Sequence, residues 1–186
     1  IQACGGRFAY VRLSAGTFPD NELEYRVHWA NARGVGLLPG PYHFLTVPAL
    51  NAEASDDKSA NDKLMAESLA SATQQAELFM ARLHEVLSLE PAEQGASRSK
   101  TFLPIVLAVA SVSPRVRNQS EAAYYAKFYT AAACQWLETV RRSLPSSSQN
   151  SLMLFTYPYI YKDYGFDRAP CSMGDIPIWL ANFPLD

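Results

Sequence analysis

The chain has 186 residues, of which 48% are hydrophobic and 18% are charged, with a formal net charge of −2 at pH 7. This composition predicts one soluble, globular domain that is large enough for a sizeable core. The balanced charge gives no basic surface for nucleic acid, and no apolar run is long enough to cross a membrane, so we expect neither partner.

The first quarter of the chain predicts a strand, a helix and a second strand. Residues 1–6 resemble the end of a helix that leads into the strand at residues 7–13, so we expect the natural polypeptide to continue upstream. The helix begins near Asn21, which has capping-box spacing to Glu24, and ends near Gly34. Its expected apolar stripe is Leu23, Val27 and Ala30. A short strand follows at residues 37–45.

Two longer helices are predicted from the 3.6-residue period of apolar positions. The first covers residues 64–87, and its expected buried face is Ala72, Ala76, Phe79, Leu83 and Val86. The second begins at Asn118, which has capping-box spacing to Glu121. Its expected buried face is Tyr125, Phe128, Ala132, Trp136 and Val140.

The last part of the chain predicts a strand at residues 152–156, an aromatic loop at 157–164 and a strand at 176–182. Strands that alternate with helices favour an α/β fold with a parallel sheet and right-handed crossovers. The three cysteines, Cys4, Cys134 and Cys171, allow one disulfide but form no zinc-binding pattern. Cys134 is interpreted as a small buried residue on a helix.

The strand predicted between the two long helices, Leu103–Ser111, is the best candidate for a buried central strand. Its apolar residues follow Pro104 without a polar interruption, which is typical of a strand buried on both faces of a parallel sheet. Because side chains alternate along a strand, Ala108 and Ala110 point to the same side near its carboxyl end. At that position a barrel strand faces the active-site mouth.

Other candidate site residues are ambiguous when each is taken alone. His43 at the end of a strand is more often a packed histidine, and Arg12 and Asp20 are more often a solvated arginine and a helix-start carboxylate. Trp179 and the loop tyrosines form a candidate wall for stacking sugar rings. Isolated aromatic residues are more often core, but four tyrosines in so short a loop are unusual for a core: Tyr157, Tyr159, Tyr161 and Tyr164. No motif for a nucleophilic serine, a phosphate loop or a zinc protease is present.

Several segments, taken in chain order, together resemble the lysozymes of glycoside hydrolase family 25. The resemblance runs from about Gly5 to Ala181, and its strongest member is Gly40-Pro41-Tyr42-His43-Phe44. The other segments are Gly6–Thr17 with Asp20, Ala30–Arg33 with Gly36-Leu37, Gln75-Ala76 with Phe79, and Ile178–Ala181. The resemblance implies an irregular TIM-like (β/α) barrel, formed by residues 1–186 as a single lysozyme-like domain. The family's first and last strands are absent, so we expect a fragment of a longer chain.

The resemblance implies hydrolysis of the β-1,4 bond between N-acetylmuramic acid and N-acetylglucosamine in peptidoglycan, without a metal or organic cofactor. In the family the central strand typically ends Leu-Asp-x-Glu, whereas this chain has Ala108 and Ala110 at the two acidic positions. That chemistry needs an acid for the leaving oxygen and a second carboxylate, and alanine supplies neither. We therefore predict little or no glycosidase activity. The resemblance implies a saccharide groove formed by Arg12, Asp20, Tyr42, His43, Tyr157 and Trp179.

Three interpretations of the chain are considered, and the first two explain the alanine pair. Identical replacements within intact flanking sequence favour an active muramidase that was deliberately inactivated. The alternative is a natural pseudoenzyme or glycan-binding module, and a third interpretation is a toxin domain recognised by an immunity or adaptor protein. In each case the expected partner is the peptidoglycan glycan strand, and the expected location is the bacterial cell wall or periplasm, reached by secretion or delivery.

Overall fold

The computed structural model describes residues 5–17, 24–89, 102–110, 118–145, 151–169, 171 and 175–181. Asp20 and the predicted helix start at Asn21 lie outside these ranges. The helices are α1 (Glu24–Gly34), α2 (Lys58–Ser88), α3 (Gln119–Ser143) and α4 (Pro158–Asp163), with short 3-10 helices at Pro48–Asn51 and Phe166–Arg168. The strands are β1 (Phe8–Ala15), β2 (Leu38–Phe44), β3 (Ile105–Val109), β4 (Leu152–Thr156) and β5 (Ile178–Leu180).

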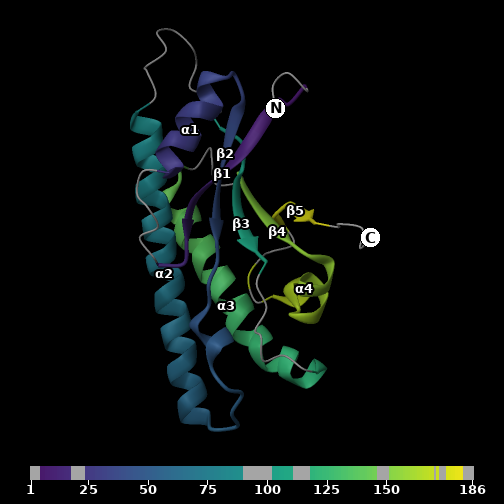
Figure 1. Cartoon of the computed structure of the whole chain (residues 1–186). Helices are drawn as coiled ribbons and strands as arrows, with labels where there is room; N and C mark the ends of the chain where they lie inside the picture. Colours follow the sequence, from purple (N-terminus) through teal and green to yellow (C-terminus); the bar gives the residue numbers. More distant parts are fainter. Residues whose placement is uncertain are drawn as a thin grey trace.

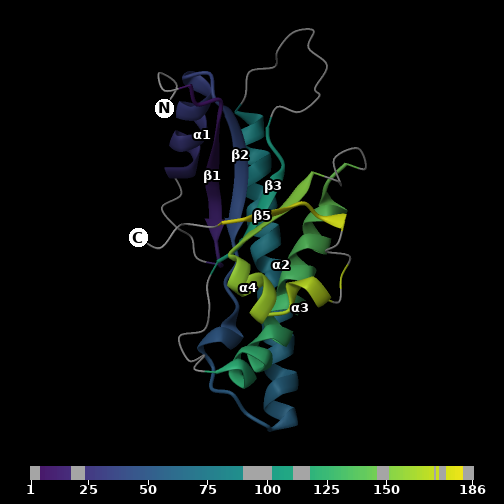
Figure 2. The same ribbon diagram turned by 90° about the vertical axis from the view of Figure 1, so that its right-hand side faces the viewer.

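The five strands form one parallel sheet in the sequential order β1-β2-β3-β4-β5. Helices α2 and α3 lie on one side of this sheet, and the short helix α4 follows β4 and packs against α3, away from α2 (Figures 1 and 2). The predicted α/β class with a parallel sheet is therefore confirmed. Within the described residues the sheet is open, because β1 and β5 each pair with one strand only, so the structure does not show a closed TIM-like barrel. No described helix has the length and apolarity needed to span a membrane.

The sheet is strongly curled. In a flat sheet the strand spacing of about 4.8 Å would place β1 and β5 about 19 Å apart, which is further than two aromatic side chains can bridge. Nevertheless the rings of Tyr10 on β1 and Trp179 on β5 lie 5.5 Å apart. The two outer strands therefore bend toward each other and make one face of the sheet concave.

The main core lies between the other face of the sheet and helices α2 and α3. Every residue predicted for the buried faces of these two helices is buried, so the helical-period prediction is confirmed. Asn118 caps α3 by accepting a hydrogen bond from the Glu121 amide at 2.9 Å. Helix α2 begins at Lys58, earlier than predicted, because Asp57 caps it through the Ser59 amide at 2.8 Å. Its polar first turns carry no apolar period that could have revealed this start.

The predicted stripe of α1 is wrong in its described members. Val27 is 53% exposed and Ala30 is also exposed, whereas Tyr25, Trp29 and Ala32 are buried. Both sets have helical spacing. The buried set includes the two large aromatic side chains, whose removal from water contributes more free energy than burial of Val27 and Ala30.

The predicted aromatic loop is largely a helix. Residues 158–163 form α4, which has Pro158 in its first turn, a position that suits a residue without an amide hydrogen. Tyr164 is 2% exposed and packs edge-on against Tyr129 of α3 at 5.5 Å, so it belongs to the core. Tyr159 is 51% exposed and remains accessible.

The interpretation of Cys134 as a simple buried residue is also wrong. Cys134 of α3 forms a disulfide with Cys171, and the two Cα atoms lie 5.6 Å apart. This bond joins the segment between α4 and β5 to helix α3. It therefore helps to hold β5, and with it Trp179, at the edge of the sheet.

Candidate functional site on the concave face of the sheet

Strand register assigns side chains to the concave face. Cα partners on adjacent strands point to the same face of a sheet. Trp179 pairs with Phe155, which pairs with Ala108, and Ala108 pairs with Phe44. Continuing to β1, Tyr42 pairs with Arg12, and Gly40 pairs with Tyr10. The concave face therefore carries Tyr10, Arg12, Gly40, Tyr42, Phe44, Val106, Ala108, Met153, Phe155 and Trp179.

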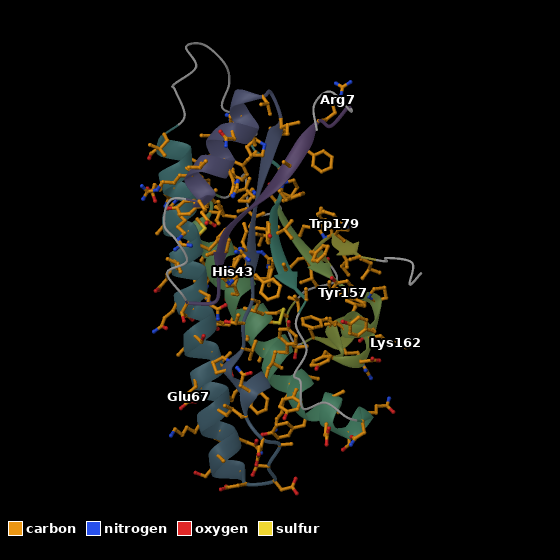
Figure 3. The ribbon with its side chains drawn as sticks, in the orientation of Figure 1. Arg7, His43, Glu67, Tyr157, Lys162 and Trp179 are labelled. Carbon is orange, nitrogen blue, oxygen red and sulfur yellow. A yellow bond between two sulfur atoms is a disulfide. The ribbon has the colours of Figure 1, made fainter. Side chains whose placement is uncertain are left out.

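A continuous series of aromatic rings crosses this face, which we call the aromatic row. Neighbouring ring centroids are 5.1 to 6.3 Å apart. Its members, in order, are Phe8, Tyr10, Trp179, Phe155, Tyr157 and Tyr159. Figure 3 shows Tyr157 and Trp179 together on the side of the molecule away from α2. Trp179 is 42% exposed, so the row offers accessible flat apolar surface beside polar hydroxyl groups.

Gly40 determines where the Tyr10 ring of the aromatic row lies. A Cβ atom at this position would lie 2.4 Å from Cε1 of Tyr10, well inside van der Waals contact. Because glycine has no side chain, the Tyr10 ring lies directly on the β2 backbone. The partial burial that results raises the pKa of the Tyr10 phenol, which keeps its hydroxyl protonated and able to donate a hydrogen bond.

The alanine pair lies at the carboxyl end of the central strand. Ala108 is 4% exposed between its register partners Phe44 and Phe155, and the half-buried Ala110 directly follows β3. None of the residues in the five described strands is Asp or Glu. The described strands therefore contain no carboxylate that could act as a general acid or base at the concave face.

The described acidic residues in the C-terminal part of the chain do not form a pair on a strand that could replace the missing carboxylates. Asp163 ends α4, Asp167 lies in the short 3-10 helix and is 3.5 Å from Arg168, and Asp175 precedes β5. All three are exposed, and Asp20 lies outside the described residues. Among the described residues, no group of three or more His, Cys, Asp or Glu side chains is arranged to hold a metal ion.

His43 lies on the opposite face of the sheet from Tyr42. It is fully buried, its ring stacks on Trp136 of α3 at 5.3 Å, and Figure 3 places it apart from Tyr157 and Trp179. Its Nδ1 is 2.8 Å from Ser14 Oγ and its Nε2 is 3.0 Å from Gln75 Oε1. Because this amide oxygen only accepts, the network fits a neutral ring that donates from Nε2. We therefore assign His43 to the packing beneath the site and do not retain it as a substrate contact.

Acid is expected to destabilise the protein through His43. Burial lowers the pKa of His43 to about 4 from 6.5, and Arg82 adds a smaller effect in the same direction. Between these two pH values the unfolded chain binds a proton that the folded chain excludes, so stability falls as the pH falls from about 6.5 to 4. The loss is about 3 kcal/mol for a shift of this size.

Urea unfolding at several pH values measures this loss. The variant His43→Gln, which keeps a donor and an acceptor, is expected to show a smaller decrease across this range than the wild type. The same substitution at the exposed His84 serves as the matched control and should leave the decrease unchanged. Equal pH dependence in all three proteins would refute the assignment.

The structure brings several of the residues predicted for the groove to one place. Arg12 is exposed and Tyr42 is half-buried, and they are register partners on the concave face. Tyr157 follows the end of β4 and joins the aromatic row with Trp179. The arrangement of these residues suits binding of a flat, hydroxyl-bearing ligand by stacking and hydrogen bonding.

Sequence reasoning missed Tyr10 and Phe155 as members of this surface. The available signal was the alternation in β1, where Val11 and Leu13 are buried and Tyr10 and Arg12 point away from them. That alternation shows that Tyr10 lies on the same face as Arg12, but it does not show which side chains from other strands Tyr10 contacts. The contact between Tyr10 and Trp179 depends on the curl of the sheet, which local sequence does not encode.

No protein-family model matches the sequence, and no curated protein matches it. Among solved structures, the chain is similar to the spore cortex lytic enzyme SleM from Clostridium perfringens. The TM-score is 0.54, with 22% identity over 97% of this chain and 47% of that chain. This similarity shows the fold.

A weaker similarity connects the chain to the modular autolysin LytC from Streptococcus pneumoniae. It has a TM-score of 0.48 and 13% identity over 83% of this chain and 27% of that chain. The chain therefore spans about half the length of the SleM chain and about a quarter of the LytC chain. More than half of the SleM chain therefore has no counterpart in this chain.

Proposed function

We propose that the chain binds peptidoglycan glycan strands on the concave face of its sheet and does not cleave them. In this proposal it is a muramidase-type protein of glycoside hydrolase family 25 in which Ala108 and Ala110 occupy the positions of the catalytic carboxylates. The observation that carries the proposal is the aromatic row beside an acid-free central strand. The similarity to SleM, a spore cortex lytic enzyme, supports a cell-wall substrate.

The chemistry of the face fits this ligand class. Sugar rings of N-acetylmuramic acid and N-acetylglucosamine present apolar faces that stack on aromatic rings, and their hydroxyl and acetamido groups need polar partners. Trp179 and Tyr157 supply rings, and Arg12 and Tyr42 supply polar atoms on the same face. The sequential parallel order of β1 to β5 agrees with part of a TIM-like barrel, which we propose as the complete fold.

The disulfide supports delivery outside the reducing cytosol. Bonds of this kind form and persist in oxidising compartments such as the periplasm and the extracellular space. The Cys134–Cys171 bond is therefore compatible with the proposed action at the bacterial cell wall. An immunity or adaptor protein as a second partner stays a prediction.

Substituting Trp179 is expected to remove most of the glycan binding. Trp179 contacts both Tyr10 and Phe155, so the Trp179→Ala variant interrupts the aromatic row at its centre. A central aromatic anchor typically contributes about 2 kcal/mol, which corresponds to a roughly thirtyfold weaker Kd. Co-sedimentation with purified sacculi, followed as a function of sacculus concentration, measures the change.

Two control variants make this experiment specific. Trp179→Phe keeps a stacking ring and should retain much of the binding. Leu89→Ala removes a side chain that is 65% exposed at the end of α2, outside the concave face, and should bind as the wild type does. If the wild-type chain is not retained by sacculi, the proposed function is wrong.

A further inference from the structure

A second candidate site lies on the helical side of the molecule, outside the concave face. It is a pocket of about 250 Å³ between α1, α2 and the end of β1. This volume is below the ~300–1,000 Å³ typical of pockets for drug-sized ligands, so its occupant must be small. The lining residues are Thr17, Tyr25, Arg26, Leu78, Ala81, Arg82 and Glu85.

Arg82 is the unusual member of this lining. It is 6% exposed, and its Nη1 donates to the Leu13 carbonyl at 2.7 Å. Its guanidinium carbon lies 5.0 Å from the centre of the Tyr25 ring. Within the described part of the chain it has no carboxylate partner. A buried arginine is normally paired, because an uncompensated buried charge costs several kcal/mol.

The remaining nitrogens of Arg82 have access to the pocket. Among the described residues, the only buried side-chain nitrogen or oxygen atom without a hydrogen-bond partner is Nε1 of Trp136. The Arg82 nitrogens that do not bond to Leu13 are therefore not sealed in the core. Since Arg82 lines the pocket, these N–H groups are available to a ligand within it.

The neighbouring charges define the sign and size of that ligand. The single carboxylate of the lining, Glu85, forms an ion pair with Arg26 and accepts a hydrogen bond from the Tyr25 hydroxyl. Counted over the described lining residues, two guanidinium groups and one carboxylate give one positive charge in excess. A monoanion balances this charge, whereas a dianion would leave one negative charge in excess. The planar donors of arginine match the two oxygens of a carboxylate.

We propose that this pocket binds a small carboxylate, held by Arg82. The ligand class includes a free carboxylic acid and the terminal carboxylate of a short peptide. This site is separate from the concave face and does not depend on the function proposed above. Occupation of the pocket would give the buried guanidinium the counter-charge that the described chain does not supply.

Calorimetric titration of the wild-type protein with N-acetyl-alanine tests the proposal, with N-acetyl-alanine amide as the uncharged control. We expect saturable binding of the acid and none of the amide. The Arg82→Gln variant should bind about tenfold more weakly, since it loses a charge-assisted hydrogen bond. Free acetate and alanyl-alanine, titrated in parallel, distinguish a free acid from a peptide terminus.

A second variant keeps the experiment decisive if Arg82→Gln does not fold. Ala81 is exposed and lines the pocket, so Ala81→Leu narrows the pocket without removing a charge and should also weaken binding. Ala66→Leu, the same change at an exposed position of α2 that does not line the pocket, is the matched control.

Three results would overturn the proposal: no saturable binding of N-acetyl-alanine, equal binding of its amide, or binding that Ala81→Leu does not affect. Tighter binding of inorganic phosphate than of N-acetyl-alanine would also overturn it. Binding detected only in the Asp20→Asn variant would overturn it too, because a carboxylate of the chain itself would then be the occupant.

Discussion

Replacing Ala108 by Asp and Ala110 by Glu is expected to give the chain muropeptide-releasing activity at least about a hundredfold above that of the wild type. A general acid in position contributes roughly a hundred- to ten-thousandfold, and the wild-type strand contains none. Both positions lie at the carboxyl end of β3, next to the aromatic row on the concave face. Release of soluble muropeptides from purified sacculi measures the gain.

The matched control for this experiment is the double variant Ala108→Asn with Ala110→Gln. It introduces side chains of nearly the same volume, but these can neither protonate a leaving oxygen nor carry negative charge. It should therefore stay inactive, and its melting temperature shows how well the buried position 108 accepts a larger polar group. If the carboxylate variant folds and binds sacculi but releases nothing, the concave face is a binding surface without the geometry of a muramidase.

Removing the disulfide is expected to cost about 4 kcal/mol of stability. Cys134 and Cys171 are separated by 37 residues, and the entropy of closing a loop of this length gives a value of that size. Urea unfolding of the Cys134→Ser/Cys171→Ser variant, compared with the oxidised wild type, measures the loss. Cys171 precedes β5 by only a few residues, so the same variant should also bind sacculi more weakly through a less firmly held Trp179.

Two comparisons make this result interpretable. Dithiothreitol should lower the stability of the wild type and leave that of the double-serine variant unchanged. The Cys4→Ser variant should behave as the oxidised wild type. Equal stability of the wild type with and without reductant would show that the bond contributes little in solution.

Much of the fold could be predicted because its core helices follow strong periodic patterns. All five predicted positions on α3, including Phe128 and Trp136, are buried, and the Asn118 cap is formed as its spacing indicates. The short helix α1 was mispredicted on its buried face, since Val27 and Trp29 both fit a helical period and only tertiary packing decides between them. The disulfide could not be assigned because three cysteines leave its pairing open.

The site was predictable only in part. The strand-end position of Ala108 followed from alternation, and Tyr42 and Trp179 followed from the family resemblance; the structure places all three on one face. His43 shares the motif with Tyr42, but adjacent residues on a strand point to opposite faces, and the helices cover the side of His43. The pocket around Arg82 gave no local signal, because its lining joins residues of α2 to Thr17 and α1, which are far from α2 in the sequence.

The missing side chain of Gly40 has a consequence for how closely the two outer strands approach each other. The Tyr10 ring fills the space above this residue and at the same time touches Trp179 from the far edge of the sheet. A Cβ atom at position 40 would overlap the Tyr10 ring, so that ring could not keep its present place. The contact between the two outer strands of the sheet therefore depends on a backbone position in β2 that has no side chain.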